Sequence, residues 1–142
     1  MSAHRPCTIA RNGQGRLTLW RAHLRRRRLV YALLLSLIII TVSSFPIVIP
    51  RGAPYNDKVL HGLTYFLLGL AYLNVATVGF TRRNTGRMLL ALLAVVIFGL
   101  LDEWCQGLVP GRVADKWDVL ADTLGGLAAL LAAMLIPRPS TT

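Results

Sequence analysis

The sequence predicts an all-α membrane protein, a bundle of four transmembrane helices with both termini in the cytoplasm. Hydrophobic residues make up 54% of the 142 residues and charged residues only 15%, against about 25% charged residues in a typical soluble domain. The apolar residues are gathered in long runs, which is typical of membrane spans. Lysine and arginine fall mainly on one side of the topology that these runs define.

Four apolar runs are each close to the length of about 20 residues that a helix needs to cross the hydrocarbon core. They cover residues 29–49, 59–80, 88–109 and 119–136. The first run contains a passable signal-peptide cleavage site at Val42-Ser43-Ser44, but it is longer than the usual apolar core of about 7–15 residues. We therefore favour a retained first helix over a cleaved leader.

The basic residues orient these four spans, because cytoplasmic segments carry an excess of lysine and arginine. Twelve of the 16 basic residues lie before the first span, between the second and third spans, or after the fourth, and four lie on the opposite side. We expect a basic cytoplasmic tail at residues 1–28, a transmembrane domain at 29–137 and a cytoplasmic tail at 138–142.

The net charge of +10 raises the question of nucleic-acid binding. The run Arg25-Arg26-Arg27-Arg28 adjoins the first apolar run, a placement typical of a topology anchor that attracts anionic lipid headgroups. No aromatic interleaving or binding motif accompanies the arginines, so we expect the lipid bilayer, and no nucleic acid, as a partner. Cys7 and Cys105 fall on opposite sides of the predicted membrane, which excludes a disulfide between them, and neither has a metal-ligand partner at CxxC spacing.

Every acidic residue falls on the predicted outer side of the membrane. These residues come from three separate stretches of chain: Asp57, Asp102, Glu103, Asp115, Asp118 and Asp122. Asp57, His61 and Tyr65 are spaced by four and share one face of the second helix. Asp118 and Asp122 share a face at the amino end of the fourth helix, where the helix dipole favours carboxylates.

Glu103 lies about 22 Å along the third helix, below the outer surface of the membrane. A carboxylate at this depth is costly unless it is protonated, paired or turned toward the bundle interior. We expect Glu103 and Asp102 to point inward, and Arg112 to pair with Asp115 or Asp118. The basic side chains available to Glu103 are Lys58, His61 and Arg112.

The fourth helix carries small residues in line with its carboxylates. Asp118, Asp122, Gly125 and Ala129 follow one stripe, with further small residues beside them. Small residues let helices approach closely in lipid. We therefore expect these carboxylates at the outer mouth of a close seam between two helices.

Two further features have simpler interpretations. Tyr65, Trp104 and Trp117 are typical of aromatic anchors at the membrane–water interface. Pro110-Gly111 predicts a turn between the third and fourth spans.

The motifs at these positions resemble the VanZ-like family, which is named for a protein encoded with glycopeptide-resistance genes. The resemblance begins at Asp57-Lys58-x-x-His61-x-x-x-Tyr65-x-x-Leu68-Gly69 and continues with Asp102-Glu103-x-x-Gln106-x-x-x-Pro110-x-Arg112-x-x-Asp115-x-x-Asp118-x-x-x-Asp122-x-x-Gly125. It covers about residues 55–130, and the shared order and spacing of several sparse motifs make it specific. Asp122 is a departure, because similar proteins often carry asparagine there. The resemblance implies a bacterial cytoplasmic-membrane protein that affects teicoplanin susceptibility, and it implies no established reaction.

The first functional hypothesis is a binding protein. An outward-facing polar pocket would hold an amphiphilic or lipid-linked component of the cell envelope, such as a lipid-linked precursor or a lipoglycopeptide. The phosphate of such a component would meet the basic side chains, and the helix seam would hold its tail. The predicted ligand-binding residues are Asp57, Lys58, His61, Tyr65, Glu103, Gln106, Arg112, Asp115, Asp118 and Asp122.

Two alternatives remain open. One is an intramembrane hydrolase or transferase for an envelope lipid, with His61, Glu103 and Asp118 as candidate acid–base residues. The sequence requires no cofactor and assigns no metal, although the carboxylates could hold a divalent cation. The outer cluster contains no serine on the predicted topology, and no HExxH or GxSxG motif is present. The other alternative is proton- or ion-coupled transport, which is disfavoured because no polar relay continues into the inner halves of the spans.

Overall fold

The computed structural model describes residues 9–45, 54–77 and 84–136. Within these ranges the chain forms four α-helices and no strand. They are α1 (Ile9–Ser44), α2 (Pro54–Ala76), α3 (Thr85–Gly107) and α4 (Lys116–Leu135). Each helix contains a segment that is long and apolar enough to cross a membrane. The predicted all-α fold with four membrane-spanning helices is confirmed, and the side on which the termini lie stays a prediction.

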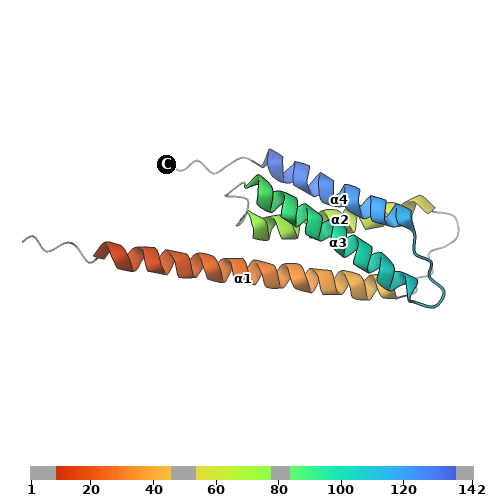
Figure 1. Ribbon diagram of the computed structural model, residues 1–142, viewed down its shortest axis with the longest axis horizontal. Helices are drawn as coiled ribbons and strands as arrows, with labels where there is room; N and C mark the ends of the chain where they lie inside the picture. Colours follow the sequence, from red (N-terminus) through yellow and green to blue (C-terminus); the bar gives the residue numbers. More distant parts are fainter. Residues whose placement is uncertain (1–8, 46–53, 78–83, 137–142) are drawn as a thin grey trace, which may run out of the picture.

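The helices α2, α3 and α4 form a bundle, and α1 lies against α2 and α3 (Figure 1). Successive helices run in opposite directions. The end of α1, the start of α2, the end of α3 and the start of α4 therefore meet at one end of the bundle, on the right in Figure 1. Every acidic residue of the chain lies near this end.

The helix α1 is longer than the sequence predicted. It begins at Ile9, so residues 9–28 are helical, and it extends well beyond the other three helices (Figure 1). Its 36 residues span about 54 Å, against about 30 Å for the hydrocarbon core. Arginine and leucine favour helix, and no proline interrupts the segment, so the helix continues through the basic run. Residues 1–8, with Cys7, and 137–142 lie outside the described residues, and the cytoplasmic location of both predicted tails stays a prediction.

The other three helices begin three to five residues earlier than the apolar runs predicted. The reason is that polar capping residues, and not apolar ones, define a helix start. The Asn84 side chain accepts a hydrogen bond from the Arg87 amide at 3.0 Å before α3, and the Asp115 side chain accepts one from the Trp117 amide at 2.9 Å before α4. Proline suits the first position of a helix, which is where α2 has Pro54.

The close seam predicted for the fourth helix is present between α2 and α4. A Cβ atom on Gly125 would lie 2.2 Å from the carbonyl oxygen of Gly62, and one on Gly69 would lie 2.7 Å from the Ala129 Cβ. Only glycine permits such contact, because any side chain would displace the facing helix. Away from the acidic end, α2, α3 and α4 share a hydrophobic core cluster that contains Leu73, Met88, Ala91, Ala129, Leu130 and Ala133.

Candidate functional site

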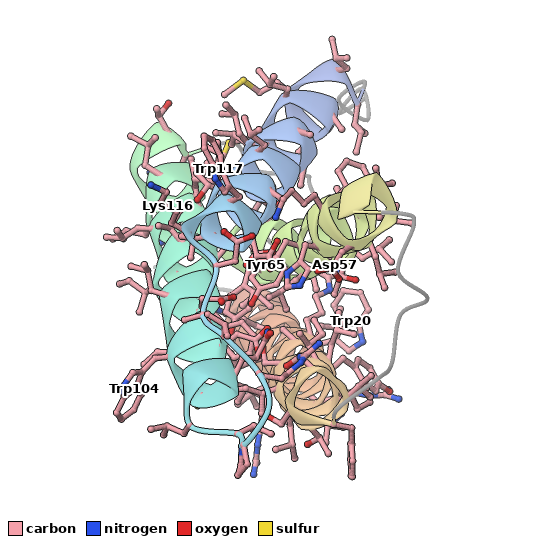
Figure 2. The ribbon with its side chains drawn as sticks, turned by 90° about the vertical axis from the view of Figure 1, so that its right-hand side faces the viewer. Trp20, Asp57, Tyr65, Trp104, Lys116 and Trp117 are labelled. Carbon is pink, nitrogen blue, oxygen red and sulfur yellow. The ribbon has the colours of Figure 1, made fainter. Side chains whose placement is uncertain are left out.

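A cavity of about 310 Å³ opens at the end of the bundle where the acidic residues gather. Its apolar wall comes from α1 and α2: Ile38, Ile39, Val42 and Leu60. Its polar lining comes from all the helices except α4, and from the loop after α3: Ser43, Asp57, His61, Thr64, Tyr65, Asp102 and Arg112. Figure 2 views the bundle from this end and shows Asp57 and Tyr65 among the helices, with Trp104 directed away from them.

Asp102 of α3 joins three helices at the base of the cavity. Its side chain is 1% exposed. Its Oδ1 accepts a hydrogen bond from Ser43 Oγ at 2.5 Å, and its Oδ2 accepts one from the Tyr65 hydroxyl at 3.1 Å. Gln106 Nε2, one turn further along α3, lies 3.4 Å from Oδ2. These donors satisfy a carboxylate inside the bundle, so the predicted inward orientation of Asp102 is confirmed.

His61 of α2 faces two carboxylates of α4 across the seam. Its Nδ1 lies 3.0 Å from Asp122 Oδ1, and its Nε2 lies 4.0 Å from Asp118 Oδ2. In the tautomer that protonates Nδ1, the ring donates to Asp122 and presents Nε2 to the space beside Asp118. The structure therefore fixes the ring by one nitrogen and leaves the other facing a second carboxylate.

Lys58, in the first turns of α2, bridges Asp115 and Asp118 at 2.7 and 2.8 Å. The expected pairing of Arg112 with these two carboxylates is therefore wrong. The sequence could not show that α2 packs directly on α4, which brings Lys58 within reach of both. The Lys58 ammonium, followed by the Trp117 amide, lowers the pKa of Asp115 below its ordinary value of 3.8, so this carboxyl is ionised at neutral pH.

Arg112 turns away from α4 and toward the carboxyl ends of α1 and α3. Its Nη1 donates hydrogen bonds to Gln106 Oε1 at 2.9 Å and to the Ser43 carbonyl oxygen. Gly111, with φ of 87°, makes the left-handed turn that directs the following residue back over the bundle; the turn predicted at Pro110-Gly111 is confirmed. Both hydrogen bonds use Nη1, and no other described residue bonds to Nη2 or Nε.

Glu103 is buried, as its depth along the helix predicted. Its Oε1 accepts a hydrogen bond from the backbone amide of Asp115 at the start of α4. The basic side chains expected as its partners make no hydrogen bond to it in the described part of the chain. Glu103 Oε2 and Asp122 Oδ2 are buried there without a hydrogen-bond partner, so each is an acceptor for a proton or a cation.

The aromatic residues divide into two groups. Tyr65 is 1% exposed and bonded to Asp102, so its interpretation as an interface anchor is wrong: its hydroxyl serves the interior network. Trp104 and Trp117 are 64% and 55% exposed, which agrees with outward-facing anchors.

Sequence reasoning missed Ser43 and left Asp102 out of the predicted binding set. The expectation that the outer cluster contains no serine is wrong, because the end of α1 brings Ser43 to Asp102 and to the cavity. The spacing of Asp102 and Gln106, one turn apart on one helix face, could have identified Asp102. No signal in the first span identifies Ser43, because its partner lies 59 residues away.

The geometry also shows which chemistry the site can support. Ser43 Oγ bonds to Asp102 and to the Ile40 carbonyl oxygen, and within the described residues it makes no hydrogen bond to His61, so these two side chains do not form a nucleophile–base pair. Asp57, His61 and Asp118 each offer one ligand atom, and these atoms lie within 4.8 Å of one another. The binding role of all the predicted site residues stays a prediction.

The chain is similar to a known protein family and to a yeast protein. The family model VanZ/LLP1 matches residues 28–137. An uncharacterised protein of the fission yeast Schizosaccharomyces pombe is 33% identical over 114 residues, which cover 80% of this chain and 67% of the yeast protein. No solved structure matches the chain. The four membrane-spanning helices, the acidic end of the bundle and the family match over residues 28–137 show that this chain is a multi-pass membrane protein that belongs to the VanZ-like family.

Proposed function

We propose that this protein binds an amphiphilic, lipid-linked component of the cell envelope in the cavity at the acidic end of its membrane bundle. The observation that carries this proposal is the composition of the cavity, which combines an apolar wall with a guanidinium at one side. An amphiphile presents this same combination, an apolar chain joined to a polar or anionic headgroup.

The apolar wall supports an approach from the bilayer. Ile38, Val42 and Leu60 line the cavity and are also more than half exposed on the outside of the bundle. An acyl or isoprenoid chain in the surrounding lipid can therefore reach the cavity between α1 and α2 without first crossing water.

Arg112 is the residue best placed to bind an anionic headgroup. Its Nη2 and Nε donors have no partner among the described residues, and a guanidinium binds phosphate oxygens through paired donors. Lys58 fits this role less well than the sequence suggested, because Asp115 and Asp118 already hold its ammonium.

Lipid binding by the purified protein tests the proposal. Native mass spectrometry in detergent would compare undecaprenyl phosphate with undecaprenol, which has the same chain and no phosphate. We expect the phosphate to bind at least about tenfold more tightly, and Arg112→Ala to remove most of this difference while Lys116→Ala, an exposed control, preserves it. Equal affinity for the two lipids, or unchanged phosphate binding in Arg112→Ala, would exclude the proposed headgroup site.

The cellular setting is part of the same proposal. The protein would lie in the bacterial cytoplasmic membrane with the cavity facing outward, and it would influence teicoplanin susceptibility through the bound component. Because a protein similar to this chain occurs in a eukaryote, fission yeast, we expect a ligand class, such as isoprenoid phosphates, that both kinds of cell contain. Teicoplanin susceptibility would be compared between a deletion strain, a strain that carries the wild-type protein and a strain that carries Arg112→Ala. Equal susceptibility of the three strains would contradict the resistance role.

A second candidate function is suggested by the hydrogen bond between His61 and Asp122, which would orient a general acid–base group beside the cavity. Hydrolysis or transfer on a lipid phosphate would then be lost in His61→Asn, while lipid binding remained. Absence of turnover for wild-type protein with lipid phosphates and diphosphates would count against an enzyme.

A further inference from the structure

We propose that Asp57, His61 and Asp118 form a binding site for one divalent transition-metal cation, such as Zn²⁺ or Mn²⁺. Their three ligand atoms lie within 4.8 Å of one another at the mouth of the seam between α2 and α4. Imidazole nitrogen and carboxylate oxygen are donors that these cations take in proteins. Asp57 and His61 line the same cavity as Arg112, but the metal site does not depend on the proposed lipid-headgroup contact at Arg112.

The orientation of His61 supports the metal site. Its Nδ1 lies 3.0 Å from Asp122 Oδ1, and Asp122 is 1% exposed. A histidine that binds metal through Nε2 usually donates its Nδ1 hydrogen to a carboxylate in this way, which fixes the ring and raises its basicity. Asp122 is therefore a positioning residue that turns Nε2 toward Asp118.

The two carboxylate ligands are arranged so that each can reach an ion beside His61. Lys58 holds Asp118 by Oδ1, at 2.8 Å, so that Oδ2 faces His61 Nε2 at 4.0 Å. Ligand atoms about 2.0–2.2 Å from a zinc ion lie roughly 3.0–3.6 Å from one another, so a small side-chain rotation closes this gap. Asp57 lies one turn before His61 on α2 and has no hydrogen bond or ion pair to another described residue, so it can turn toward the ion without losing a partner.

The buried charge around these ligands also favours a cation, independently of the ligand geometry. Glu103 and Asp122, both more than nine-tenths buried, each have an oxygen without a hydrogen-bond partner. Glu103 is close enough to Asp118, His61 and Asp122 to interact with them electrostatically. Across the described residues, Lys58 is ion-paired with Asp115 and Asp118, and no lysine or arginine is ion-paired with Glu103 or Asp122. A surplus of buried negative charge in a membrane protein is costly unless a proton or a cation balances it, and a divalent cation supplies that balance.

The metal site would be accessible from the cavity, and its three protein ligands would not fill the coordination sphere of the ion. Asp57 and His61 line the cavity, so an ion can enter from it. Three protein ligands leave at least one coordination position of a tetrahedral ion for water or a phosphate oxygen.

Metal titration of the purified 142-residue chain tests the inference. After treatment with EDTA and gel filtration in detergent, Zn²⁺ binding would be measured by competition with a fluorescent chelator, and Mn²⁺ binding by electron paramagnetic resonance. We expect one ion per chain, with nitrogen coupling from one histidine in the Mn²⁺ echo-modulation spectrum. Less than 0.1 ion per chain for both metals would overturn the proposal.

Matched variants separate a built site from general attraction between charges. We expect His61→Asn and Asp118→Asn to weaken binding at least about tenfold and His61→Asn to remove the nitrogen coupling, whereas His23→Asn, on the distant part of α1, changes neither. Asp57→Asn should also weaken metal binding. We expect this variant to fold as the wild type does, because the Asp57 side chain has no hydrogen bond or ion pair to another described residue. Glu103→Gln removes the same charge as Asp118→Asn without removing a ligand. If Glu103→Gln weakened binding as much as Asp118→Asn did, or if the nitrogen coupling survived in His61→Asn, the assigned ligands would be wrong.

The outcomes distinguish this inference from the proposed lipid function. Stoichiometric Zn²⁺ in protein that shows no preference for undecaprenyl phosphate would support the metal site and reject the headgroup site. If metal-free protein preferred the lipid phosphate through Arg112, and the protein bound neither Zn²⁺ nor Mn²⁺, the headgroup site would be supported and the metal site rejected.

Discussion

Gly62 of α2 and Gly125 of α4 are in direct backbone contact, since a Cβ atom on Gly125 would come within 2.2 Å of the Gly62 carbonyl oxygen. This contact lies one residue along α2 from His61 and one turn along α4 from Asp122. The glycine contact therefore sets the separation at which the imidazole reaches its carboxylate, 3.0 Å between Nδ1 and Oδ1. The geometry of the acidic end depends on how closely these two backbones approach.

The first prediction concerns this contact. Gly125→Ala should destabilise the bundle by about 3 kcal/mol, the upper part of the usual range for overpacking, because a backbone carbonyl cannot move aside as a side chain can. The measurement is the thermal unfolding midpoint in detergent. Gly86→Ala, in the exposed first turn of α3, is the matched control and should keep the wild-type midpoint or raise it slightly. A wild-type midpoint for Gly125→Ala would contradict the close seam.

The second prediction concerns the bonds to Asp102. Ser43→Ala removes one donor from this carboxylate and should cost about 1 kcal/mol, whereas Asp102→Asn places an amide against several donors and should cost about 2–3 kcal/mol. Ser44→Ala is the matched control, because among the described residues the Ser44 hydroxyl bonds only to the Ile40 carbonyl oxygen of its own helix. In a double-mutant cycle, Ser43→Ala and Asp102→Asn should be clearly non-additive. Additive effects in denaturant unfolding would show that the two side chains do not interact.

The third prediction concerns the pKa of Asp115, which Lys58 lowers. A carboxyl with a lowered folded-state pKa contributes stability above its ordinary value, and this contribution is lost as the pH falls through the folded-state pKa. Lys58→Gln should therefore raise the pKa of Asp115 toward 3.8, and the stability difference from wild type should be present at neutral pH and vanish at low pH. Carboxyl carbon NMR of labelled aspartate measures the pKa. Lys116→Gln, which removes a weaker electrostatic contribution, is the control and should shift the pKa of Asp115 less. An unchanged Asp115 pKa in Lys58→Gln would show that the ion pair does not form.

The fourth prediction concerns orientation in the membrane. In a background in which serine replaces both cysteines, Val113→Cys should react with a membrane-impermeant maleimide added to intact cells, because the α3–α4 loop is predicted to lie outside. Thr85→Cys, at the start of α3, should react only after the cells are permeabilised. The reverse labelling pattern would invert the topology, and labelling of both positions from one side would contradict the assignment of α3 as a membrane span.

The sequence predicted the number of helices and the position of the small-residue seam because both depend on patterns within one stretch of chain. Apolar runs of about 20 residues predict spans without any knowledge of the neighbours. The inward orientation of Asp102 and Glu103 followed in the same way from the cost of a carboxylate in lipid. The helix starts were less accurate, because the apolar runs mark the membrane-facing part of a helix, whereas Asn84 and Asp115 cap it from polar segments outside that part.

What the sequence by itself determined is the membrane architecture and the gathering of six carboxylates at one end of the bundle, since hydropathy and charge act along the chain. The tertiary structure decided which donor meets which acceptor. Lys58, and not Arg112, pairs with Asp115 and Asp118, whereas Arg112 donates hydrogen bonds to Gln106 and Ser43. Ser43 also donates to Asp102, in a cluster for which the sequence predicted no serine. A hydrogen bond requires its donor and acceptor atoms to lie about 3 Å apart. For residues far apart in the chain, only the packing of α1 and α4 against α2 and α3 fixes such a short distance.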